Sequence, residues 1–161
     1  MRCGYRDPVS LGADRWANLV ACQALGLTPC VVASLGTAMT VDAIDASGAH
    51  LGGLILPGTG LMRQGLREGT AGIRAVEGDF EPFPGSTGNA VETGILEAQA
   101  GALAGLRARF EAHAGRAVTA VLTGGDSARL LGRVPAPVRV VDDLVMEGVL
   151  WMAKDLGVRG I

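Results

Sequence analysis

Hydrophobic and polar residues alternate along the first third of the chain in a pattern that predicts three consecutive strands. The runs at about 29–35, 38–45 and 49–56 are apolar or β-branched, with polar residues at alternating positions. Short turns separate them at Gly36-Thr37 and at Ala46-Ser47-Gly48. Because such short connections join antiparallel neighbours, we expect the sheet to begin with three antiparallel strands.

Helical spacing predicts a helix from Gly12 to about Leu25, before the first strand. The other expected elements are a helix over about 59–67, a long loop over 69–86, a helix over about 87–113, a strand over 117–122, a short helix over about 127–132, a strand over about 138–141 and a last helix over about 143–157. This order fits one α/β domain over 1–161: a ribonuclease H-like half-domain, with a mixed sheet and helices on both faces. The same unit builds the actin, Hsp70 and sugar-kinase group of ATP-binding proteins.

Composition narrows the functional classes. The chain has 161 residues, of which 48% are hydrophobic and 19% are charged, and its net charge is −2. These values are typical of a soluble globular domain, and the absence of a basic block argues against nucleic-acid binding. No apolar run reaches membrane-spanning length, and the N-terminus does not resemble a signal peptide. Lys154 is the only lysine, which excludes a P-loop lysine or a Schiff base unless Lys154 serves.

The cysteines and histidines do not form a metal-binding pattern. Cys3, Cys22 and Cys30 are odd in number and lack metal-ligand spacing, so we expect reduced, mostly buried thiols in a cytoplasmic protein. His50 and His113 lack a partner pattern, and we expect structural or surface roles for both.

Two short stretches carry candidate chemistry. At the Gly36-Thr37 turn, the hydroxyls of Thr37 and Thr40 and the free N–H groups can donate to anionic oxygens, although a plain hairpin is the alternative. At the start of the first helix, Asp14 and Arg15 are either a helix cap and a surface charge, or an Asp–Arg pair whose carboxylate is free to take a proton.

Several motifs occur together and in order: Tyr5-x-x-Pro8 with Leu11-Gly12-Ala13-Asp14-Arg15-Trp16; Gly36-Thr37-Ala38-x-Thr40-Val41-Asp42; Gly52-Gly53 with Pro57-Gly58; Thr87-x-x-Ala90-Val91-x-x-Gly94; Thr123-Gly124-Gly125-Asp126; and Asp143-Leu144-Val145-x-x-Gly148. In order and spacing they resemble the type III pantothenate kinases and the related Bvg accessory factors. The resemblance covers nearly the whole chain.

The resemblance implies ATP-dependent phosphorylation of pantothenate to 4'-phosphopantothenate, the first step of coenzyme A synthesis. It implies that Asp14 is the catalytic base, and that Mg²⁺ and a monovalent cation, K⁺ or NH₄⁺, take part. The residues implied in pantothenate binding are Tyr5, Gly12, Ala13, Asp14, Arg15 and Thr87. Those implied in nucleotide binding are Gly36, Thr37, Thr40, Gly53, Gly124 and Gly125. A homodimer is expected, because members of the family bind pantothenate near a subunit interface.

Two departures from the family pattern lead to an alternative function. Nothing in the chain matches the family's first half-domain with its Asp-x-Gly-Asn-Thr phosphate loop, so we expect this chain to correspond to the second half. Ser34 stands where the family has an acidic residue that faces phosphate and metal, and Asp42 is a second candidate metal ligand. The alternative is a weakly active or inactive accessory protein that binds pantothenate or a nucleotide.

Overall fold

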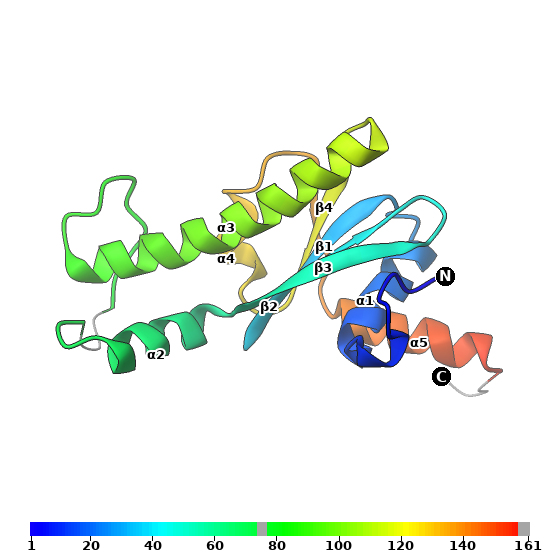
Figure 1. The fold of residues 1–161 in the computed structure, drawn as a ribbon, viewed down its shortest axis with the longest axis horizontal. Coiled ribbons are helices and arrows are strands. Elements are labelled where there is room, and N and C mark those ends of the chain that lie inside the picture. Colours follow the sequence, from blue (N-terminus) through cyan, green and yellow to red (C-terminus); the bar gives the residue numbers. More distant parts are fainter. Residues whose placement is uncertain (74–76, 158–161) are drawn as a thin grey trace.

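A computed structural model describes residues 1–73 and 77–157 and shows a five-stranded mixed sheet. Its strands are β1 (Cys30–Leu35), β2 (Ala38–Ile44), β3 (His50–Pro57), β4 (Thr119–Thr123) and β5 (Val138–Val140). The spatial order is β3-β2-β1-β4-β5; β2 pairs antiparallel with β1 and β3, whereas β1, β4 and β5 run parallel (Figure 1). This order confirms the expected ribonuclease H-like arrangement.

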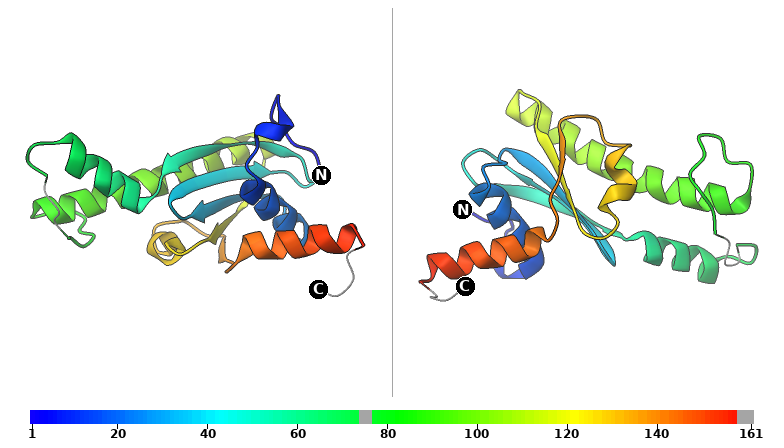
Figure 2. Two further views of the ribbon diagram at one scale, coloured as in Figure 1. Left: turned by 90° about the horizontal axis from the view of Figure 1, so that it is seen from below. Right: turned by 180° about the vertical axis from the view of Figure 1, so that it is seen from behind.

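Helices cover both faces of the sheet (Figure 2). They are the short 3₁₀ helix η1 (Pro8–Ser10), α1 (Ala13–Ala24), α2 (Thr59–Gly69), α3 (Thr87–Ala114), α4 (Ser127–Leu131) and α5 (Leu144–Asp155). Residues of α1 and α5, such as Leu19 and Leu144, form one buried cluster with Val32 of β1. Leu103 and Leu130, of α3 and α4, join the cluster on the other face. The sheet therefore separates two apolar cores. Each core buries the apolar side chains that point to its face of the sheet, as the alternation in the sequence predicts.

Helices α1 and α5 cross at very short range. A side chain at Gly148 of α5 would overlap the backbone of Ala17 in α1, so the crossing depends on a glycine. The glycines of α3 behave differently, because a Cβ at Gly94 or Gly101 would meet open space. Gly94 and Gly101 therefore do not pack tightly on the sheet within this chain.

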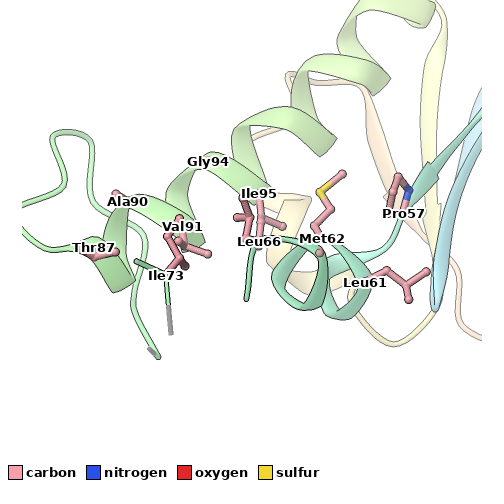
Figure 3. A pocket seen from close by; sticks show the side chains of 11 residues that line it. Pro57, Leu61, Met62, Leu66, Ile73, Thr87, Ala90, Val91, Gly94 and Ile95 are labelled. Carbon is pink, nitrogen blue, oxygen red and sulfur yellow. The ribbon is translucent and has the colours of Figure 1, made fainter. Parts of the chain in front are cut away.

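Helix α2 and the first part of α3 extend beyond the sheet as a two-helix arm (Figure 1). A pocket of about 620 Å³ lies between the two helices, and apolar side chains line it almost throughout (Figure 3). Leu61, Met62 and Leu66 contribute from α2, and Val91 and Ile95 from α3. The arm therefore presents an open apolar surface.

The first residues of the chain lie along the edge of the sheet. Arg2 forms a parallel bridge with Ala49, and the backbone N–H of His50 donates to the carbonyl of Arg2 at 2.9 Å. A side chain at Gly4 would overlap the carbonyl of His50. This close approach holds Cys3 and Tyr5 beside the beginning of β3, which is one of the two edge strands.

Most predicted elements agree with the structure to within one or two residues at each end. The strand expected from 117 begins at Thr119, because the backbone N–H of Val118 donates to the Glu111 carboxylate instead of to a neighbouring strand. The helix η1 was not expected; Asp7 caps it by accepting from the Val9 N–H at 3.2 Å. Residues 74–76 of the expected loop lie outside the described residues. No helix in the described ranges is long and apolar enough to cross a membrane.

Candidate functional site

The site begins at the N-terminus of α1, where Gly12 caps the helix without a side-chain hydrogen bond. Asp14 is exposed in the first helical turn, where the helix dipole favours a negative charge. A Cβ atom at Gly12 would lie 2.7 Å from Oδ1 of Asp14. Glycine at this position therefore leaves the space that the Asp14 carboxylate occupies.

Arg15 is buried and pairs with Asp42, not with the neighbouring Asp14. Its Nε donates to Oδ2 of Asp42 at 2.9 Å and its Nη2 to Oδ1 at 2.6 Å, while its Nη1 donates to the hydroxyl of Tyr5 at 2.8 Å. Burial by itself lowers the pKa of Arg15, but the hydrogen bonds and charge of Asp42 raise it above the ordinary value. Both alternatives for Arg15 are wrong: it is neither a surface charge nor the partner of Asp14, because a bidentate partner on β2 holds the guanidinium.

Asp42 is fully engaged within the fold. Its carboxylate accepts both hydrogen bonds from Arg15 and lies 2.9 Å from Nε2 of His50. A carboxylate that is 2% exposed and has these partners has no free oxygen for a metal ion, so we do not retain Asp42 as a metal ligand.

Gly53 lies beside this ion pair. A Cβ at Gly53 would overlap Oδ1 of Asp42 and come within 2.7 Å of Nη2 of Arg15. The need for glycine at this place is thus explained by the buried pair, and contact between Gly53 and a nucleotide stays a prediction.

Three hydroxyl side chains lie in register across the sheet. Ser34 of β1 is paired with Thr40 of β2 and with Thr123 of β4. Val32 and Asp42 both contact α1. Ser34 lies two residues after Val32 and Thr40 two residues before Asp42, so strand alternation places both hydroxyls on the α1 face as well. The row is a set of neutral donors and acceptors.

The Gly36-Thr37 turn closes the same end of the sheet. The Gly36 N–H donates to the carbonyl of Ala38 at 3.1 Å, and the N–H of Gly58 donates to the carbonyl of Thr37 at 2.9 Å. The Gly36 N–H is therefore not free for an anion, contrary to our expectation. Thr37 itself is exposed at the tip of the turn.

Gly124 lies directly against Leu35, next to this turn, and Gly125 follows it. Gly124 has φ +92, and a side chain there would overlap the backbone of Leu35, the last residue of β1. The N–H of Asp126 donates to the carbonyl of Leu35 at 3.4 Å. The two predicted nucleotide motifs are far apart in sequence. The structure brings them together at the end of the sheet where β1 and β4 finish.

Thr87 lies away from the other residues expected to bind pantothenate. It is the first residue of α3 and lines the pocket in the arm (Figure 3). Figures 1 and 2 place this end of α3 at the tip of the arm and α1 beneath the sheet. Within one chain, Thr87 therefore does not join Tyr5, Gly12 and Asp14.

The sequence did not indicate the ionic contacts that join the two helices of the arm to each other and to α4. Glu92 of α3 is buried and pairs with Arg63 of α2, at 2.6 Å from its Nη2, and with Arg129 of α4. Burial and the nearby charge of Arg63 lower the pKa of Arg129. His50 was also expected to be merely structural, and its position between Asp42 and Cys3 was not foreseen. For the contacts of Glu92, the one signal in the sequence was the presence of this carboxylate on the inner face of α3.

The described residues do not fit a protein-bound divalent cation. They contain no group of three or more His, Cys, Asp or Glu side chains placed to hold a metal ion. Ser34 offers a hydroxyl in a row of hydroxyls, whereas Mg²⁺ in proteins is usually bound through carboxylates and substrate phosphates.

The strand order and the two glycine turns at one end of the sheet define the class of the protein. It is a ribonuclease H-like domain of the actin, Hsp70 and sugar-kinase group. A solved structure of a Baf family protein from Campylobacter jejuni is similar in fold, with a TM-score of 0.65 over 92% of this chain and 66% of that one, at 24% identity.

The sequence profile of the type III pantothenate kinases matches residues 1–109, and the chain belongs to this family. The type III pantothenate kinase of Thiobacillus denitrificans is 44% identical over 97% of this chain, and that of Chromobacterium violaceum is 45% identical over 96%. The chain spans 64% and 65% of the length of these two relatives.

Proposed function

We propose that this domain binds pantothenate and the phosphates of ATP and phosphorylates pantothenate on its primary hydroxyl. The observation that carries the proposal is the meeting of the Gly36-Thr37 turn, Gly124 and the Ser34 hydroxyl row at the end of β1. Helix α1 packs on the face of the sheet that carries the Ser34 row, since Leu19 and Val32 belong to one buried cluster. Asp14 is therefore on the side of the sheet where the phosphates would lie.

The residues suit a phosphoryl transfer in which the protein mainly positions its substrates. In this proposal Asp14 accepts the proton of the attacking hydroxyl, since its exposed carboxylate projects from the first turn of α1. The hydroxyls of Thr37, Thr40 and Ser34 donate to phosphate oxygens. Mg²⁺, with K⁺ or NH₄⁺, is the family's expected means of charge neutralisation, but no step is assigned to it because the hydroxyl row at Ser34 carries no negative charge.

Arg15 is proposed as a positioning residue. All three of its donor nitrogens are used within the fold, and it is 4% exposed, so it does not present a free guanidinium to pantothenate. It instead fixes the hydroxyl of Tyr5, a half-buried side chain that can contact the substrate.

A second copy of the chain would complete the pantothenate site. Thr87 lies at the tip of the arm, and the pocket beside it is apolar and open. We propose that two chains associate through their arms, so that Thr87 of the partner subunit reaches the site formed by Asp14 and Tyr5. Burial of the apolar pocket would favour this association.

A non-catalytic accessory protein is the second candidate function. The neutral row at Ser34 favours it, because a hydroxyl does not supply the negative charge that would attract a metal ion to the phosphates. Such a protein would bind pantothenate or a nucleotide without turnover.

The test is release of ADP from ATP on addition of pantothenate, with Mg²⁺ and K⁺ present. We expect pantothenate-dependent release by the parent chain, and a fall of about 10²–10⁴-fold in Asp14→Asn, the size typical of a lost general base. Calorimetric titration with pantothenate and far-ultraviolet circular dichroism check that the variant still binds and folds.

The Ser34→Asp variant separates the two candidate functions. Turnover by Ser34→Asp but not by the parent would make Ser34 the cause of inactivity. Pantothenate binding without ADP release in either chain would contradict the kinase and support the accessory protein.

A further inference from the structure

We propose that Cys3 is a nucleophilic thiol, activated by His50 and Asp42, that exchanges with low-molecular-weight disulfides. The three side chains come from separate places: Cys3 from the N-terminal segment, His50 from the start of β3, and Asp42 from β2. The proposal does not rest on pantothenate phosphorylation, although Asp42 also holds Arg15 in place.

The three groups form a continuous line. Sγ of Cys3 lies 3.9 Å from Nδ1 of His50, and Nε2 of His50 lies 2.9 Å from Oδ1 of Asp42. Because the carboxylate accepts a hydrogen bond at Nε2, the imidazole presents Nδ1 as the acceptor for the Cys3 proton. A thiol, a base and a carboxylate that orients the base are the components of an activated nucleophile.

The line is held rigidly by its neighbours. Arg15 fixes Asp42 through two hydrogen bonds, and the ring of Tyr5 lies on His50 with its centroid at 5.4 Å. The bridge between Arg2 and Ala49 fixes the backbone directly before Cys3 and His50. The relative position of thiol and imidazole therefore does not depend on a flexible terminus.

The charged and titratable groups that face His50 support a thiolate–imidazolium pair. They are Asp42, Arg15, Tyr5 and Cys3. Burial lowers the pKa of His50, but its hydrogen bonds to Asp42 and Cys3 raise it overall; the contact with His50 in turn lowers the pKa of the Cys3 thiol.

The other two cysteines provide internal controls. Cys22 and Cys30 are fully buried, whereas Cys3 is half-buried at the sheet edge. Hydrogen bonding to Cys22 and burial raise the pKa of Cys30, so that thiol stays protonated. Reaction with a water-soluble disulfide should therefore occur at Cys3 alone.

The exchange is balanced without a further oxidant. The proton of the Cys3 thiol passes to Nδ1 of His50, and the thiolate attacks one sulfur of the disulfide R–S–S–R. The S–S bond of the reagent breaks as a bond between Sγ and the first sulfur forms, and the second sulfur leaves as a thiolate, which can take the proton. Cys3 is oxidised to a mixed disulfide, and half of the reagent is reduced to a thiol.

The test follows the reaction of the folded chain with an aromatic disulfide whose released thiolate absorbs visible light. We expect one thiol to react rapidly at about pH 7, with a rate profile whose midpoint lies below the ordinary thiol pKa of about 8.5. Peptide mass analysis should place the mixed disulfide on Cys3, and Cys3→Ser should abolish the rapid phase while Cys30→Ser leaves it unchanged.

His50→Gln tests the activation itself. We expect the rapid phase to slow by about tenfold at pH 7 and the midpoint to move upward, since one unit of thiol pKa changes the thiolate fraction tenfold. Circular dichroism checks the fold of the variant. If the variant is unfolded, the pH–rate profile of the parent chain alone decides whether the proposal holds. A parent midpoint at or above that of the urea-unfolded chain would overturn the proposal, as would an unchanged rate in folded His50→Gln.

Discussion

At the scale of single residues, the buried carboxylate of Asp42 is the group on which the substrate side of the domain depends. It holds Arg15 in place through two hydrogen bonds, and Arg15 in turn holds the hydroxyl of Tyr5. Arg15 and Asp42 are 4% and 2% exposed, so neither charge has water as an alternative partner. Gly53 gives the pair its space.

Asp42→Asn should destabilise the fold by about 3–5 kcal/mol, because it leaves the Arg15 guanidinium buried without a neutralising charge. Urea unfolding followed by circular dichroism measures the change. The matched control is Glu97→Gln, which neutralises an exposed carboxylate of α3 and should change the free energy of unfolding by less than about 0.5 kcal/mol. Equal effects of the two substitutions would contradict the assigned role of the pair.

This pair also marks the limit of what single residues reveal in the sequence. Arg15 and Asp42 were both singled out, but their pairing was not, because it depends on how α1 is rotated over β2. The same is true of His50, which reaches Asp42 because Ile44 is paired with His50 after a register shift at Ala43. Motif spacing identifies the residues of a site, whereas side-chain partners follow from register and helix rotation.

At the scale of elements, helices α1 and α5 cross in close contact at Gly148. Gly148 lies so close to Ala17 that even a methyl group would overlap the backbone. Because α1 carries Asp14 and Arg15, the crossing also fixes the start of α1 relative to the sheet.

Gly148→Ala should lower the free energy of unfolding by about 1–3 kcal/mol, the usual cost of overpacking, despite the better helix propensity of alanine. The control is Gly101→Ala in α3, where the added methyl group meets open space and should stabilise the helix by about 1 kcal/mol. Thermal unfolding of both variants measures the difference. A stabilised Gly148→Ala variant would show that the two helices are not tightly packed.

Helices and strands were predicted closely from the sequence because their apolar periods are regular and glycines or prolines mark their ends. The arm was less predictable. The apolar positions of α2 and α3 predicted two helices, but not that part of their apolar surface would lie beyond the sheet. Where a helix extends past its sheet, its pattern does not show what covers it.

At the scale of the whole molecule, the arm gives the domain a shape that a second copy would complete. Leu61 is 44% exposed and lines the pocket between α2 and α3. The wall opposite includes Val91 and Ile95, so the pocket offers apolar area on two helices at once.

Analytical ultracentrifugation should show a dimer at micromolar concentrations, and Leu61→Asp should shift it toward monomer because a carboxylate would be buried in an apolar interface. The control is Val9→Asp, which places the same charge at a residue that is 91% exposed outside the arm. A parent chain that remains monomeric at every concentration, or equal sedimentation of the two variants, would argue against association through the arm.

The bridge between Arg2 and Ala49 also has a consequence for how the protein behaves when it is handled. An edge strand such as β3 exposes unpaired backbone groups that can recruit strands from other molecules and begin aggregation. Here the first residues of the chain occupy one end of that edge, and Pro57, which lacks an N–H, ends the other. The N-terminal segment thus covers part of an edge where aggregation could begin, as well as carrying Cys3 and Tyr5.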